Sequence, residues 1–197
     1  MEGFVTGVFE ASAAVKAQAG TALAPAIVRA AELIAASYRK GGILYTCGNG
    51  GSAADAQHLA GEMVGRYKRD RPPLAAVSLS TDPSTITCIA NDYGYDEIFS
   101  RQVAALATAR DVVLGISTSG QSKNVLLAMQ AARARGAGTV GLTGGTGGEL
   151  ARSVDVAIIV PHTYTPRIQE CHLTTLHVLS ELIEYLVLGL PLPTGPG

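Results

Sequence analysis

A histidine, a glutamate and an arginine recur every four residues on one predicted helix. His58, Glu62 and Arg66 follow a glycine turn in the stretch CGNGGSAADAQHLAGEMVGRY, residues 47–67. At about 100° of rotation per residue these side chains share one helical face, and Asp55 extends the line. Imidazole and carboxylate groups placed so could exchange protons with a substrate or hold a cation. A solvent-facing ladder of ion pairs has the same spacing, so the pattern alone leaves both interpretations open.

The glycine turn before this helix is a candidate anion site. Gly48-Asn49-Gly50-Gly51-Ser52 follows the apolar run ILYTC and precedes the predicted helix. Glycines allow positive φ and a close approach of the backbone to a ligand, and a new helix presents unpaired N–H groups. Ser52 and Asp55 also match an S-x-x-D capping box, and the plain alternative is a tight strand-to-helix turn.

A second loop is rich in hydroxyl groups. Ser117-Thr118-Ser119-Gly120-Gln121-Ser122 follows the apolar run DVVLGI and opens another predicted helix. Four hydroxyls and several backbone N–H groups suit the terminal oxygens of a phosphate monoester, whereas helix capping needs only one hydroxyl. The chain lacks the Gly-Lys-Ser/Thr of a Walker A motif, which argues against nucleoside triphosphate chemistry.

Two further candidates lie on the last predicted helix. Gln169 and His177 are about 12 Å apart along its axis, so they converge on one point only by leaning together or by serving sites of different subunits. His172 lies nearer the apolar stripe and is expected in the core or an interface. A Glu and a His facing a sugar phosphate suit aldose–ketose interconversion through an enediol. A His, Glu, Gln, His set could instead bind zinc, which would leave Glu62 less free to act as a base.

Five short apolar runs without strict alternation predict strands buried on both faces of a parallel sheet. Helical segments separate them, so we expect an α/β fold with a doubly wound, five-stranded parallel sheet. The sequence predicts a single domain over 1–197, with N-terminal helices in 1–40 and an α/β core in 41–190. The predicted strands are 43–47, 74–80, 111–117, 138–144 and 156–160, and the main helices are 53–66, 96–108, 122–135, 148–152 and 168–188.

The composition narrows the class of protein. Fifteen basic and 16 acidic residues nearly cancel, which disfavours a nucleic-acid binder or a reader of anionic membranes. Three widely spaced cysteines favour a reducing compartment. The N-terminus lacks a signal-peptide pattern, and Glu181 and Glu184 interrupt the most apolar late stretch, so we expect a cytoplasmic protein without a membrane span.

Together these motifs resemble the bacterial phosphoheptose isomerases of the sugar-isomerase (SIS) domain superfamily. The resemblance covers about residues 40–188 and rests on CGNGGSAADAQHLAGEMVGRY, IANDYGYDEIFSRQV, ISTSGQS, LTGGTGGEL and RIQECHLTTLHVLSELIE. It implies a SIS-type, flavodoxin-like fold and conversion of D-sedoheptulose 7-phosphate to D-glycero-D-manno-heptose 7-phosphate. That reaction begins the route to nucleotide-activated heptoses for surface polysaccharides such as lipopolysaccharide. The resemblance also implies a homotetramer with active sites between subunits.

The same resemblance implies roles for individual residues. Glu62 and His177 would be the acid/base pair, and zinc would bind near His58, Glu62, Gln169 and His177. An intersubunit site would give Gln169 and His177 more freedom to assemble. The residues implied to bind the sugar phosphate are Asn49, Gly50, Gly51, Ser52, Glu62, Arg66, Asn91, Asp92, Ser117, Thr118, Ser119, Ser122 and Gln169.

Some features of the resemblance leave alternatives. Pro166 stands where some relatives have an acidic residue, which puts a polar role at that position in doubt. A paralogous group with the same fold has lost the catalytic residues and regulates replication initiation, so a non-catalytic SIS module that binds a sugar phosphate or a partner is the alternative. The presence of both Glu62 and His177 favours the enzyme. Heptose, as opposed to a hexose or amino-sugar phosphate, comes from the resemblance alone.

Overall fold

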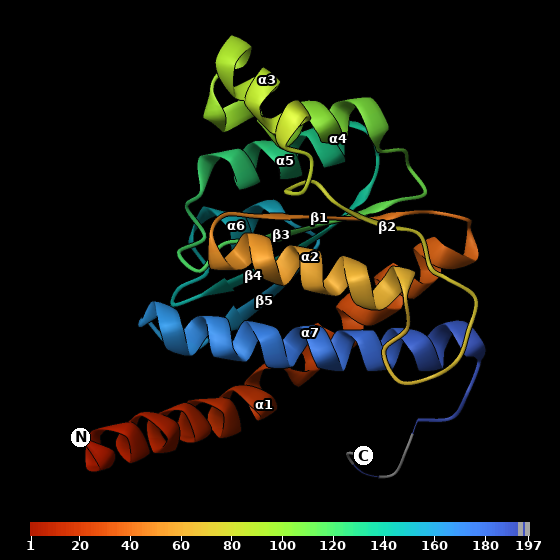
Figure 1. The fold of residues 1–197 in the computed structure, drawn as a ribbon. Helices are drawn as coiled ribbons and strands as arrows, with labels where there is room; N and C mark the ends of the chain where they lie inside the picture. The colour runs from red at the N-terminus through yellow and green to blue at the C-terminus, as the bar shows by residue number, and fades with distance from the viewer. Residues whose placement is uncertain (193–194, 196–197) are drawn as a thin grey trace.

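Five parallel strands lie between two layers of helices in the computed structural model, which describes residues 1–192 and 195 (Figure 1). The sheet order is β2-β1-β3-β4-β5, so the doubly wound, flavodoxin-like sheet is confirmed. Every residue of β1 and β3 is buried, which explains their uninterrupted apolar sequences. The strands are β1 Leu44–Gly48, β2 Ala76–Ser78, β3 Val112–Ile116, β4 Gly138–Gly144 and β5 Val156–Val160.

Each face of the sheet has its own apolar core. Leu59 and Leu176 belong to the core beneath α1 (Glu2–Arg39), α2 (Gly51–Val64) and α7 (Thr165–Leu188). Phe99 and Met129 belong to the core on the other face. The helices there are α3 (Pro83–Tyr93), α4 (Ser100–Leu106), α5 (Lys123–Ala134) and α6 (Gly148–Ser153). Figure 1 shows α2 and α7 side by side across the first face, so residues far apart in the chain can meet there.

The first 40 residues differ from the prediction of several helices. They form one continuous helix, α1, with Pro25 in its interior. Pro25 removes the N–H that would bond to the Thr21 carbonyl, but both residues lie on the exposed side, where water can bond to the freed carbonyl. Leu23, Ile27 and Ile34 keep the opposite side buried in the core, so packing sustains the helix past the proline.

By length and hydropathy alone, α1 could also cross a membrane. Its most apolar window of 18 residues has a mean hydropathy of 1.4 and is 39% buried. Within the described residues no other helix meets that criterion. The buried part packs on α7 and β5, as the core helix of a globular domain does, so this is weak evidence for a membrane span.

Two predictions about α2 are wrong. The capping box does not form, because Gly50 occupies the N-cap position and Ser52 lies buried within the first turn. The helix ends at Val64 with Gly65 as its C-cap, so Arg66 lies beyond the helix that was predicted to carry it. The segment 96–108 likewise divides into a 3₁₀ turn, Tyr95–Glu97, and the short helix α4.

Candidate active site

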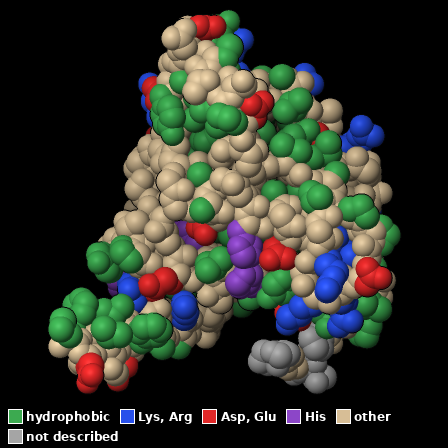
Figure 2. Space-filling model, in the orientation of Figure 1, with side chains coloured by type: hydrophobic (Ala, Val, Ile, Leu, Met, Phe, Trp, Pro, Cys, Tyr) green, Lys and Arg blue, Asp and Glu red, His purple; other side chains and the backbone are tan. Residues whose placement is uncertain are grey.

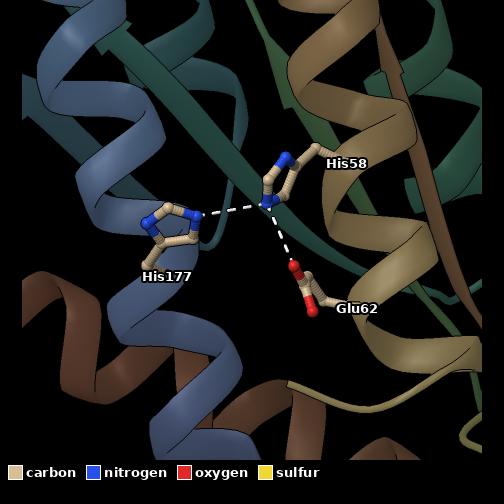
Figure 3. A group of neighbouring side chains, drawn as sticks. All are labelled: His58, Glu62 and His177. Atoms are coloured by element: carbon tan, nitrogen blue, oxygen red, sulfur yellow. Dashed lines mark hydrogen bonds and ion pairs between the residues drawn. The ribbon is translucent and has the colours of Figure 1, made fainter. Parts of the chain in front are cut away.

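Three side chains from α2 and α7 meet at one point on the surface of the first helical layer. His58 Nε2 lies 3.2 Å from Glu62 Oε1 and 3.2 Å from His177 Nε2. Figure 3 shows both imidazoles and the carboxylate converging between the two helices. His58 and Glu62 meet because they are four residues apart on α2, and His177 reaches them because α7 packs alongside. All three belong to one chain, so this cluster needs no second subunit.

The cluster is open on one side and supported on the other. The side chain of His58 is 37% exposed and that of Glu62 is 22% exposed, and Figure 2 shows histidine at the surface over this region. The Tyr67 ring stacks on His177, with centroids 5.6 Å apart and planes inclined by 22°. A small molecule can therefore approach the imidazoles from the exposed side, while the stacked Tyr67 ring supports the ring of His177.

Asp55 lies one turn before His58 and has a perturbed carboxyl group. Burial raises its pKa to about 6, and the nearby His58 acts in the opposite direction. Its Oδ2 atom is buried and has no hydrogen-bond partner within the described residues. The predicted stripe therefore divides into a partly buried acid at Asp55, a contacting pair at His58 and Glu62, and an exposed Arg66.

The donor set suits a borderline metal ion such as zinc. One ligand atom each from His58, Glu62 and His177 lies within 4.8 Å of the other two. Two imidazole nitrogens facing each other, with a carboxylate oxygen beside them, match the nitrogen and oxygen ligands that zinc prefers. Three protein ligands would leave a further position for Gln169 or for substrate.

The two predicted anion loops lie next to each other at the carboxyl ends of the parallel strands. Gly48 at the end of β1 pairs with Ile116 at the end of β3, so the loops that follow these strands start side by side. In the sheet, β2 lies on one side of β1 and β3 lies on the other, so the strand order reverses between β1 and β3. This position is the topological switch point, where α/β folds bind ligands.

Hydroxyl groups converge in the second loop. Ser117 Oγ lies 2.9 Å from Ser122 Oγ and 3.5 Å from Ser119 Oγ. Ser122 is the N-cap residue of α5, yet its side chain makes no capping bond. Capping therefore does not account for these serines, whereas a cluster of hydroxyls at the N-terminus of a helix suits a phosphate.

A reciprocal amide pair joins the two loops. Asn49 donates to Asn124 Oδ1 at 2.9 Å and accepts from Asn124 Nδ2 at 2.9 Å, while the Tyr95 hydroxyl also donates to Asn49, at 3.0 Å. Asn124 and Tyr95 were absent from the sequence-based site. The available signal for Asn124 was a polar residue at the start of α5, directly before the apolar run Val125–Met129.

Gln169 is the contact between α7 and the glycine turn. A Cβ atom on Gly51 would meet the end of the Gln169 side chain, so a larger residue at this position would displace the Gln169 amide. Gln169 lies two helical turns before His177, just as Gly51 lies about two turns before His58. Gln169 and His177 thus lie on one side of α7, with Leu173 between them along the helix.

Comparison with known proteins identifies the family. Residues 9–144 match the SIS domain. A phosphoheptose isomerase from Thiobacillus denitrificans is 53% identical over 188 residues, which cover 94% of this chain and 95% of that protein. The chain belongs to the phosphoheptose isomerase family.

Solved structures of phosphoheptose isomerases have the same fold. GmhA from Neisseria gonorrhoeae is 45% identical with a TM-score of 0.88, covering 93% of this chain and 98% of that one. The enzyme from Francisella tularensis is 38% identical with a TM-score of 0.87, covering 91% and 95%. The resemblance seen in the sequence motifs is therefore confirmed over nearly the whole chain.

Three residues assigned by the family resemblance lie outside the cluster of His58, Glu62 and His177. Asn91 and Asp92 are exposed on α3, across the sheet from α2 and α7, and Asn91 donates to Asp92 at 2.8 Å. Arg66 is exposed beyond the end of α2 and donates to the Lys68 carbonyl at 3.4 Å. Within the described residues, the chain itself brings none of these three into the histidine cluster.

Proposed function

We propose that this chain is a cytoplasmic sugar-phosphate isomerase that converts D-sedoheptulose 7-phosphate to D-glycero-D-manno-heptose 7-phosphate. The observation that carries the proposal is the meeting of Glu62, His58 and His177 on helices that also border a hydroxyl-rich loop. The heptose follows from the relatives, which are named phosphoheptose isomerases.

The phosphate would bind at the second loop. Ser117, Thr118, Ser119 and Ser122 offer hydroxyl donors, and the first turn of α5 adds backbone N–H groups. Asn49, Gly50 and Gly51 would line the sugar, with Ser52 beneath them and Gln169 at the side. This arrangement would direct the reacting end of the sugar along α2 toward Glu62.

Glu62 and His177 would move the protons of the reaction. The Glu62 carboxylate takes a proton from C1 of the ketose and returns it to C2, through an enediol. His177 moves the proton between the oxygens on C1 and C2, so no atom is gained or lost overall. Glu62 serves as both base and acid on one face of the enediol, which would fix the configuration at C2.

His58, Glu62 and His177 would hold a zinc ion, with Gln169 as the candidate fourth ligand. Bound zinc would polarise the sugar oxygens and favour enolisation. Zinc added to chelator-treated protein is expected to raise the Tm of the wild-type chain but not that of His58→Ala. Metal content measured on freshly purified protein checks the same assignment; binding that is equal in both proteins would contradict it.

We also propose that the chain forms a homotetramer with active sites between subunits. The N-terminal part of α1 exposes 78% of Phe4 and 73% of Phe9, and Figure 2 shows it as an apolar projection. A second copy would cover these side chains and could bring its Asn91, Asp92 or Arg66 to the site. Light scattering that gave a monomer at micromolar concentration would contradict this assembly.

Turnover tests the function directly. Purified protein supplied with zinc and sedoheptulose 7-phosphate is expected to form the aldose product, detected by NMR. The absence of turnover under these conditions would remove the proposal and favour a binding module, which ligand-induced stabilisation would then reveal. A much higher kcat/KM for a hexose or amino-sugar phosphate would keep the isomerase and change its substrate.

A further inference from the structure

A buried ion pair joins the segment after α2 to α7. Arg71 Nε lies 3.1 Å from Glu184 Oε1, and each side chain is only 1% exposed. The chain carries a second, exposed pair one turn earlier on α7, where Lys68 lies 3.0 Å from Glu181 and the side chains are 43% and 26% exposed. Both pairs connect the same segment to α7. Comparing variants of the two pairs therefore separates the effect of the buried pair from that of losing any contact between the segment and the helix.

Glu184 holds the backbone of the segment as well as Arg71. Its two carboxylate oxygens accept N–H bonds from Tyr67 at 2.9 Å, Lys68 at 3.2 Å and Arg69 at 3.1 Å. Three successive N–H groups and a guanidinium therefore surround one carboxylate, which compensates for its removal from water. The segment is fixed at the residue whose ring stacks on His177.

Arg71 holds the end of α2. Its guanidinium donates to the backbone carbonyl of Glu62 at 2.8 Å and to that of Met63 at 2.9 Å. These are among the last carbonyls of α2, which lack partners within the helix, and a cation there also complements the helix dipole. The guanidinium is thus bonded to the backbone of the residue that carries the proposed catalytic carboxylate.

We infer that Arg71 and Glu184 are positioning residues that set the Glu62 carboxylate and the His177 ring relative to each other. Arg71 acts on Glu62 through the backbone of α2, and Glu184 acts on His177 through Tyr67. The inference rests on the proposed function, because it concerns the geometry of the proposed acid/base pair. An apolar pair could fill the same space, but it could not bond to two helix carbonyls and three N–H groups.

The test uses two conservative variants and a matched control. Arg71→Lys keeps a charge beside Glu184 but loses the planar fork that reaches both carbonyls. Glu184→Gln keeps the shape and loses the charge. Glu181→Gln and Glu181→Ala break the exposed pair on the same helix and leave in place Lys68, whose Nζ lies 5.6 Å from the centroid of the Tyr67 ring. Circular dichroism establishes folding, and the double variant Arg71→Gln/Glu184→Gln, which removes both charges, replaces any single variant that fails to fold.

A positioning role predicts that kcat falls while KM changes little. Arg71→Lys is expected to lose about 100-fold in kcat, because a small misplacement of reacting groups costs that much. Glu184→Gln, which acts on His177 through the Tyr67 ring, is expected to lose about tenfold. KM for sedoheptulose 7-phosphate is expected to stay within about threefold, since the Ser117–Ser122 loop is untouched. The exposed-pair controls are expected to keep wild-type kcat. A folded buried-pair variant with kcat within about twofold of wild type would overturn the inference, as would a rise in KM with kcat retained.

A second readout does not depend on turnover. In protein with ¹³C-labelled histidine, the stacked Tyr67 ring shifts the His177 ring protons, and Tyr67→Ala calibrates the size of that shift. The buried-pair variants are expected to move these signals in the same direction as Tyr67→Ala, whereas the controls leave them unchanged. Unmoved signals would overturn the inference. If the wild-type chain shows no turnover, the proposed function fails while this readout still decides the positioning role.

Discussion

Two sides of α7 place the same residue type in opposite surroundings. His172 is fully buried against the sheet, where its Nε2 lies 3.1 Å from the Thr143 carbonyl. His177, five residues later, lies at the surface, where its Nε2 meets His58 and its ring stacks on Tyr67. Five residues turn a helix by about 140°, so the two rings face different layers of the molecule.

The difference shows what makes a histidine available for chemistry. Burial lowers the pKa of His172 to about 4, and the ring stays neutral with its proton committed to a carbonyl. The His177 ring contacts His58, which in turn contacts the Glu62 carboxylate. The buried histidine is thus part of the core, whereas the surface one is in contact with the other side chains of the proposed site.

Removing the proton-transfer groups is expected to have the largest effect. Glu62→Gln and His177→Gln should each lower kcat by about 10³-fold, because general acid–base catalysis contributes that order of rate. Neither change leaves a buried charge unpaired, so the Tm of the metal-free protein should change little. Initial rates with sedoheptulose 7-phosphate and a thermal melt check both statements; activity retained by either variant refutes its assigned role.

The pH dependence of stability should come from the buried histidine. The pKa of His172 is lower in the folded state than the ordinary value of 6.5, so the unfolded chain binds this proton first as the pH falls. The contribution of His172 to stability therefore falls by up to about 3 kcal/mol between about pH 6.5 and 4, whereas the raised pKa of Asp55 acts in the opposite direction. Urea unfolding of wild type and His172→Leu at several pH values measures this contribution as the difference between the two free energies of unfolding. The Asp55 contribution is common to both proteins and cancels in that difference. Parallel curves would contradict the assignment.

His172→Leu should also separate stability from activity at neutral pH. The substitution leaves the Thr143 carbonyl without its donor in the core, which costs about 1–3 kcal/mol. Because His172 faces away from the cluster, kcat should stay within about twofold of wild type. Urea unfolding at pH 7 gives the first value and steady-state kinetics the second. A large loss of kcat in folded protein would end the division of roles along α7.

The stacked tyrosine should give the smallest effect. Tyr67→Ala is expected to lower kcat by about tenfold at most, since an aromatic pair contributes about 0.5–1.5 kcal/mol. Tyr67→Phe keeps the ring and should behave as wild type. If the phenylalanine variant lost as much activity as the alanine variant, the hydroxyl would matter and stacking would not explain the support of His177.

The sequence predicted the sheet well because buried parallel strands have a simple pattern. The β4 and β5 boundaries agree with prediction. Helix ends were less predictable. Gly65 ends α2 two residues early, and tertiary packing carries α1 past Pro25.

The site was predictable only where its residues are neighbours in sequence. The contact between His58 and Glu62 follows from helical spacing, whereas the contact with His177 depends on how α7 packs beside α2. The amide pair of Asn49 and Asn124 and the ring of Tyr67 likewise depend on packing between distant segments. No periodicity in the sequence encodes such contacts, so they appear only once the elements are assembled.

The amide pair between Asn49 and Asn124 has a thermodynamic consequence for ligand binding. Because two reciprocal bonds tie the glycine turn to the first turn of α5, the two loops are held together without a ligand, and a sugar phosphate bound as proposed would find them already arranged. Binding then requires little loss of conformational entropy in the protein, and more of the interaction energy remains as affinity. Asn124, which need not touch the ligand, would thereby contribute to the affinity of every ligand that spans both loops.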